Sequence, residues 1–268
     1  MGTYFQEEAF GTSPYPWQHQ IITQLCCMVI PNSGIPPAPV LLVEPTDDGK
    51  SVIRNILSIT NGAFLLTITP LILLEANVET KMTLKTKYTV GTVVLVHLDT
   101  ISLLKDQNDL VMELKHLLLD GHTNVLLFLS PHVILNKKLP WSDFIDWLMV
   151  NKRLSMVCVD KVHLFVHFGL TFRDNFKGLT PVLFAKLKVV GSGTMAVFPL
   201  LFMTGIGLKT IVFLLQKLLG IHFDNKHNIF WPLDEDMQHC WVFFEVKMNF
   251  GQLLKDSTAN KFMLYTNT

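Results

Sequence analysis

The chain has 268 residues, enough for one large domain or two smaller ones, and hydrophobic residues make up 49% of it. Its 22 Lys and Arg residues equal its 22 Asp and Glu residues, so bulk electrostatics do not support a long basic face for nucleic acid. The four cysteines lack the spacing of metal ligands, which argues against a zinc site and favours free thiols in a reducing compartment.

In chain order, the sequence predicts an alternation of strands and helices after a first helix at 17–29 and a Pro-rich loop at 31–39. The predicted pairs of strand and following helix are 40–43 and 50–59, 63–69 and 71–82, 92–98 and 106–119, 125–130 and 143–151, 156–160 and 176–189, 196–204 and 208–219. Near-continuous apolar strands alternating with helices are typical of a parallel sheet that is covered on both faces. We therefore expect an α/β fold.

Three stretches without Asp, Glu, Lys or Arg, at 20–43, 55–74 and 189–208, are long enough to span a bilayer. Each is interrupted by Pro, Gly or Asn, which favours buried strands separated by loops, with a membrane protein as the alternative. The N-terminus, with Glu7 and Glu8, lacks the basic start and apolar core of a signal peptide. We expect an intracellular protein, nuclear or otherwise.

The segment 40–51, VLLVEPTDDGKS, is similar to a phosphate-binding loop between a strand and a helix. In such a loop, backbone N–H groups surround a polyphosphate, the lysine (here Lys50) reaches its terminal phosphates, and the serine (here Ser51) holds Mg²⁺. Asp47 and Asp48, however, stand where phosphate oxygens would lie. Each carboxylate–phosphate pair would cost roughly 1–3 kcal/mol of repulsion at about 5 Å.

The apolar strand predicted at 156–160 ends in the carboxylate of Asp160, followed by Lys161 and His163. A strand that ends in Asp, opposite a phosphate loop, is the usual setting for a Mg²⁺ ligand.

The run 160–176, DKVHLFVHFGLTFRDNF, resembles the Asp-Glu-x-His box and the aromatic-rich loop of RecQ-type DNA helicases. Further segments resemble the other motifs of that family, in the same order, over about residues 10–268. These segments are 16–18, 69–72, 129–131, 203–205, 218–220, 228–229 and 261–268.

This resemblance implies a RecA-like ATP-binding lobe at 1–221, then a linker and the first strand of a truncated second lobe at 222–268. It implies ATP-driven 3′-to-5′ unwinding, with ATP and Mg²⁺ as cofactors, single-stranded or partly duplex DNA as partner, no membrane, and a monomer. The residues that match the family's ATP-binding positions are Gln18, which would read adenine, Thr46, Gly49, Lys50 and Ser51. Asp160 and His163 match its catalytic positions. Ser51 and Asp160 match its Mg²⁺ ligands, and Thr204 matches the position that couples hydrolysis to movement. Those that match its nucleic-acid contacts are Thr69, Ser130, Phe168, Phe172 and Arg173.

The sequence also departs from the family's pattern. Lys161 stands where the family has the glutamate that activates water, and a cation cannot accept a proton. Asp47 replaces a glycine, Gly205-Ile206 replaces Ala-Thr, and Phe168 replaces a tryptophan. We therefore expect a degenerate RecQ-like helicase domain with impaired or no ATPase activity. A non-catalytic module that binds nucleic acid or a partner is the alternative.

Two of these substitutions exchange charge between the phosphate loop and the box. Asp47 and Asp48 add negative charge to the loop, and Lys161 adds positive charge to the box strand. We expect the carboxyl ends of these two strands to lie side by side, so that Lys161 pairs with one of the aspartates. Independent drift, with the side chains in water, is the alternative.

Several other residues have structural interpretations. His97, His163 and His167 have no second ligand at metal spacing, and Trp141 and Trp147 fit packing. Two interpretations stay open for the phenylalanines that follow the box, which either fill the core or stack on bases. They are Phe165, Phe168, Phe172 and Phe176.

Overall fold

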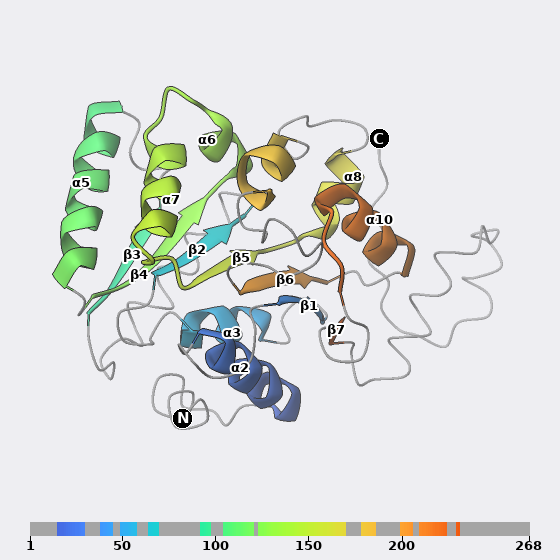
Figure 1. The fold of residues 1–268 in the computed structure, drawn as a ribbon. Helices are drawn as coiled ribbons and strands as arrows, with labels where there is room; N and C mark the ends of the chain where they lie inside the picture. Colours follow the sequence, from blue (N-terminus) through green and yellow to red (C-terminus); the bar gives the residue numbers. More distant parts are fainter. Residues whose placement is uncertain are drawn as a thin grey trace, which may run out of the picture. The chain divides into compact units, whose positions relative to one another are not determined.

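The computed structural model of the chain describes residues 15–29, 38–44, 49–57, 64–69, 92–97, 104–120, 123–169, 178–185, 199–205, 209–223 and 229–230. These residues form a seven-stranded sheet in the order β3-β4-β2-β5-β6-β1-β7 (Figure 1). Every strand pairing in it is parallel. The strands are β1 (Pro39–Val43), β2 (Phe64–Ile68), β3 (Thr92–His97), β4 (Thr123–Leu129), β5 (Met156–Val159), β6 (Leu200–Thr204) and β7 (Ile229–Phe230).

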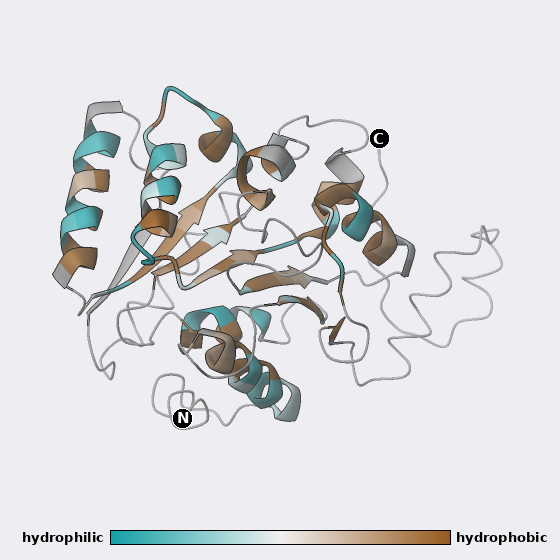
Figure 2. Cartoon of the chain, in the orientation of Figure 1, coloured by the Kyte–Doolittle hydropathy of each residue, from teal (hydrophilic) through white to brown (hydrophobic). Residues whose placement is uncertain are grey.

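The helices cover both faces of this sheet, which confirms the α/β class (Figure 1). Helices α2 (Pro16–Val29) and α3 (Lys50–Leu57) pack on one face. The elements on the other face are α5 (Leu104–Asp120), α6 (Pro131–Leu135), α7 (Trp141–Val150), α8 (His163–Gly169), η4 (Thr180–Phe184) and α10 (Lys209–Leu219). The strands between the two helical layers are largely apolar, as expected for a sheet with two buried faces (Figure 2).

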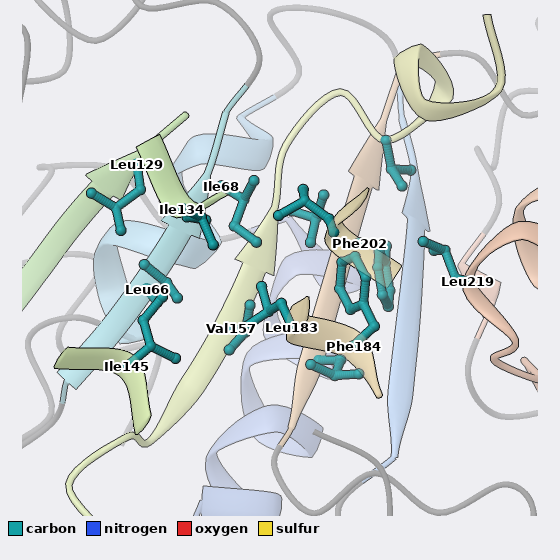
Figure 3. Close-up of a cluster of buried hydrophobic side chains, with 14 of the residues drawn as sticks. Leu66, Ile68, Leu129, Ile134, Ile145, Val157, Leu183, Phe184, Phe202 and Leu219 are labelled. Atoms are coloured by element: carbon teal, nitrogen blue, oxygen red, sulfur yellow. The ribbon is translucent and has the colours of Figure 1, made fainter. Parts of the chain in front are cut away.

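The core on the α7–α10 face is rich in aromatic side chains. Phe184 packs against Phe202 with ring centroids 6.0 Å apart, and against Phe165 at 6.2 Å. Figure 3 shows Phe184 and Phe202 beside Leu183 and Val157. Phe165 is buried in this core, so it packs and does not present its ring for base stacking.

The strand order corrects one expectation. Strand β6 lies between β5 and β1 and pairs with both, so the box strand and the phosphate-loop strand are not neighbours. Two inter-strand spacings place the backbones of β5 and β1 about 10 Å apart. The order of strands along the chain does not reveal this insertion, because β6 comes last of the three in sequence.

Two short helices begin where the sequence predicted none. Helix α6 starts directly after β4, with Ser130 as its N-cap and Pro131 in its first turn. Helix α8 starts at His163, within the segment assigned to the box and the aromatic-rich loop. Both are shorter than the 11-residue windows on which helical periodicity is judged.

The described part of the helix predicted at 176–189 contains a π-helical turn, η4. The Ala185 N–H bonds to the Thr180 carbonyl at 2.9 Å, a spacing of five residues. Pro181, which has no N–H to donate, lies in the first turn of η4.

Strand β7 pairs in parallel with β1, with Leu41 opposite Ile229. This sheet therefore includes residues beyond 221, the predicted end of the first lobe. Residues 224–228 and 231–268 lie outside the described part, so the assignment of 222–268 to a linker and a second lobe stays a prediction. Among the described helices, none has both the length and the apolar character needed to cross a membrane.

Candidate nucleotide site

Several of the predicted site residues that the structure describes lie at the carboxyl edge of the sheet, because parallel strands all end on the same side. Four backbone hydrogen bonds tie the residues that follow the strands to their neighbours across this edge. The bonds are Thr69 N to Leu129 O (3.1 Å), Asp160 N to Ile68 O (2.9 Å), Val162 N to Met203 O (3.0 Å) and Glu44 N to Thr204 O (3.1 Å). These bonds therefore fix the positions of the segments that follow the strands, from β4 across to β1.

Gly49 ends the phosphate loop in a left-handed conformation, with φ +83°. A side chain there would be strained, and its Cβ would lie 2.6 Å from Gln18 Nε2. That Nε2 donates to the Gly49 carbonyl at 3.3 Å, and Gln18 Oε1 accepts from the Tyr15 N–H at 2.9 Å. Gln18 is only 2% exposed, so in this structure its amide holds α2 against the loop.

Lys50 is the first residue of α3, and its ammonium donates to the Glu44 carbonyl at 2.6 Å. The Lys50 side chain thus connects the first residue of α3 to the residue directly after β1. Ser51 is exposed at the start of the same helix, where the positive end of the helix dipole favours an anion. Lys50 and Ser51 therefore have positions that would suit the phosphate end of a nucleotide.

Asp160 and Lys161 form a tight turn directly after β5. The Lys161 N–H donates to Asp160 Oδ1 at 2.8 Å, and Lys161 has a left-handed φ of 51°. Both side chains are half-buried. Asp160 Oδ1 thus accepts a hydrogen bond from the next residue, and Oδ2 would be the oxygen available to bind a Mg²⁺ ion.

His163 connects the box to the end of β6. Its Nδ1 lies 2.8 Å from Thr204 Oγ1, and Thr204 is 1% exposed. The sequence assigned both residues to family motifs, and the fold brings them together across 41 residues.

The residues predicted to contact nucleic acid differ in how accessible the structure makes them. Thr69 is 3% exposed, so its hydroxyl would reach DNA only after a rearrangement. Ser130 is half-buried and caps α6, accepting from the Val133 N–H at a long 3.4 Å. Phe168 lies on α8, whereas Phe172 and Arg173 lie outside the described residues.

Three predicted loop residues, Thr46, Asp47 and Asp48, are also outside the described part. The proposed ion pair between Lys161 and an aspartate therefore stays a prediction. Within the described ranges, no three His, Cys, Asp or Glu side chains cluster as metal ligands. Ser51 and Asp160 are the two predicted Mg²⁺ ligands, a sparse set that suits a hydrated ion held mainly by phosphates.

Two buried polar residues near this edge were missed by sequence reasoning. Arg54 lies on α3, one turn after Lys50, and Thr67 lies within β2. Nothing in the local pattern marks them, since a charge on a helix usually faces solvent and threonine is common in strands. Burial raises the pKa of the nearby Cys158 thiol, an effect that Arg54 partly opposes and Asp160 reinforces.

No protein-family model matches the chain, and no curated protein matches it significantly. Among solved structures, the chain is similar to the crystal structure of the Pyrococcus furiosus Hef helicase domain, with 15% identity and a TM-score of 0.45. The match covers 84% of this chain and 39% of that chain. A likeness at this level carries nothing about what this chain binds or does.

Proposed function

We propose that this chain is a degenerate helicase-like lobe of RecQ type that binds a nucleotide weakly and hydrolyses it slowly or not at all. The observation that carries this proposal is the contact between the Lys50 ammonium and the Glu44 carbonyl beside the left-handed Gly49. A lysine held by a backbone carbonyl across a loop can exchange that acceptor for a phosphate. Bound Mg²⁺ would neutralise phosphate charge, with Ser51 and Asp160 as its protein ligands.

The lack of hydrolysis follows from Lys161 at the position of the water-activating glutamate. An ammonium group can neither accept a proton nor orient water as a base. The His163–Thr204 contact supports the helicase-like part of the proposal, because it joins the box to the predicted coupling motif.

Titration of the purified chain with Mg²⁺ and a fluorescent ATP analogue tests nucleotide binding. We expect weak binding that Lys50→Ala removes, while Lys217→Ala, at an exposed position on α10, leaves it unchanged. Equal binding by the two variants would contradict the proposal. Turnover stimulated severalfold by single-stranded DNA and abolished by Lys50→Ala would contradict the proposed lack of hydrolysis.

A second candidate function is a non-catalytic module that binds nucleic acid or a partner, which the lysine at position 161 favours. DNA binding should then persist in Lys50→Ala. Because the net charge is zero, we expect few phosphate contacts and a slope of log K against log salt of about −2 to −3 at most. A steeper slope, or nanomolar binding at physiological salt, would reveal a larger basic surface.

A further inference from the structure

Three side chains form a row across the sheet beneath α3. Thr67 of β2 lies opposite Phe128 of β4 on one side and opposite Cys158 of β5 on the other. Phe128 and Cys158 belong to the core on the α2–α3 face. Since side chains in register point to the same face, the Thr67 hydroxyl points there too.

Arg54 of α3 covers this row. Its guanidinium carbon lies 4.8 Å from the centroid of the Phe128 ring, and its Nε donates to Asn55 Oδ1 at 3.3 Å. The side chain is 2% exposed, although it carries a full positive charge. Phe128, which the guanidinium covers, is the strand neighbour of Thr67, so the charge lies near this row.

Two buried polar atoms in this region make no hydrogen bond: Arg54 Nη2 and Thr67 Oγ1. Thr67 is 0% exposed. Buried polar groups are nearly always paired, and buried charges nearly always have an opposite charge beside them. In the part of the chain that the structure describes, no carboxylate pairs with Arg54.

We propose that Arg54 and Thr67 bind a chloride-sized monovalent anion between α3 and the sheet. Arg54 Nη2 and the Thr67 hydroxyl donate to it, and the anion neutralises the buried guanidinium. The neutral Cys158 thiol, beside Thr67 in the row, is a third and weaker donor. The site lies on the α3 side of the sheet and is independent of the proposed nucleotide function.

The chemistry of the donors favours an anion over water. Among the described residues, the two unpartnered buried atoms belong to a guanidinium and a hydroxyl, which can both donate at once, as can the Cys158 thiol. An anion needs only donors, whereas a water molecule also has two hydrogens that need acceptors. Water would also leave the buried charge without a counter-charge.

Crystals of the chain soaked in bromide provide the direct test. We expect an anomalous peak within hydrogen-bonding distance of both Arg54 Nη2 and Thr67 Oγ1. A water molecule in that place without anomalous signal would overturn the proposal. A direct bond between the two side chains, leaving no room for an ion, would overturn it as well.

Thermal and urea unfolding in chloride and in gluconate, at equal ionic strength, provide the test in solution. Above the dissociation constant, each tenfold rise in chloride should lower the unfolding equilibrium constant about tenfold. Thr67→Val and Arg54→Met should each weaken this dependence. The matched controls Thr123→Val and Arg153→Met, outside the row, should preserve it.

The dependence on chloride, and not stability itself, is the decisive readout, because Arg54→Met is a large change in a core. If Arg54→Met does not fold, Thr67→Val and the bromide crystals still decide. An equal free energy of unfolding in chloride and in gluconate would contradict the proposal. An equal chloride effect in Thr67→Val and in the unchanged chain would contradict it as well.

Discussion

The imidazole Nδ1 of His163 lies 2.8 Å from the Thr204 hydroxyl and joins the start of α8 to the end of β6. Val162, beside His163, also bonds through its N–H to the carbonyl of Met203, the neighbour of Thr204. Two adjacent hydrogen bonds therefore hold the box against the predicted coupling motif.

Replacing Thr204 with Val should lower the free energy of unfolding by about 1–2 kcal/mol, because His163 Nδ1 loses its hydrogen bond to the buried Thr204 hydroxyl. Urea denaturation measures this loss. A double-mutant cycle with His163→Ala should give a coupling energy of about 0.5–1.5 kcal/mol. Additive effects would show that the contact adds nothing to stability.

Lys161→Gly should increase the free energy of unfolding by up to about 1 kcal/mol. A left-handed φ costs an L-residue about 1–2 kcal/mol, and this gain exceeds the extra entropy of glycine in the unfolded chain. Lys152, with φ 52°, is the matched control, and Lys152→Gly should have a similar effect. A loss of stability only in Lys161→Gly would show that the lysine side chain itself forms a stabilising contact, as an ion pair with Asp47 or Asp48 would.

The double substitution Asp47→Gly with Lys161→Glu should strengthen nucleotide binding, but should not create unwinding. It removes a carboxylate from the phosphate loop and removes Lys161, the predicted ion-pair partner of Asp47 or Asp48. Loss of the Asp47 carboxylate relieves about 1–3 kcal/mol of repulsion, which corresponds to roughly 5- to 150-fold in affinity. Titration with the fluorescent analogue measures the change, and Lys50→Ala in the same background should abolish it.

Gln107→Leu should destabilise the chain by about 1–3 kcal/mol. The Trp141 indole N–H donates to Gln107 Oε1 at 2.8 Å, and both residues are buried. Trp141→Phe in the Gln107→Leu background should cost less than in the unchanged chain, because it removes the unpaired donor. Equal costs in the two backgrounds would contradict this expectation.

Burial raises the pKa of the Cys158 thiol above its ordinary value of 9.0, so the folded chain keeps this proton when the unfolded chain loses it. The contribution to stability is complete below about pH 9 and declines as the pH rises above it. Cys158→Ala should reduce that decline. In the native chain Cys158 should resist maleimide labelling, measured by peptide mass spectrometry, and react after unfolding.

Much of the fold follows from local patterns in the sequence. Each of the six predicted strands has a counterpart with bounds shifted by a few residues, since apolar runs between turn residues mark buried strands directly. The packing roles of Trp141 and Trp147 are also confirmed. Helix 71–82 lies outside the described residues and stays a prediction.

The site could be predicted only in part. Gly49, Lys50 and Asp160 were identified from the loop and strand-end patterns, and Thr204 from the family resemblance. All four lie at the carboxyl edge of the sheet, because parallel strands end on the same side. The cap formed by Ser130 was missed, although Ser-Pro before a short apolar run is an N-cap signal. Family resemblance had assigned that serine to nucleic acid instead.

By itself, the sequence determined the class of the fold and the edge at which polar residues meet, because periodicity and strand ends are local properties of the chain. Only the tertiary structure decided that β6 separates β5 from β1, that His163 reaches Thr204, and that Arg54 is buried over the Phe128 ring. These relationships join residues that are far apart in sequence. They depend on strand order and on which helix covers which face, and no local pattern contains that information.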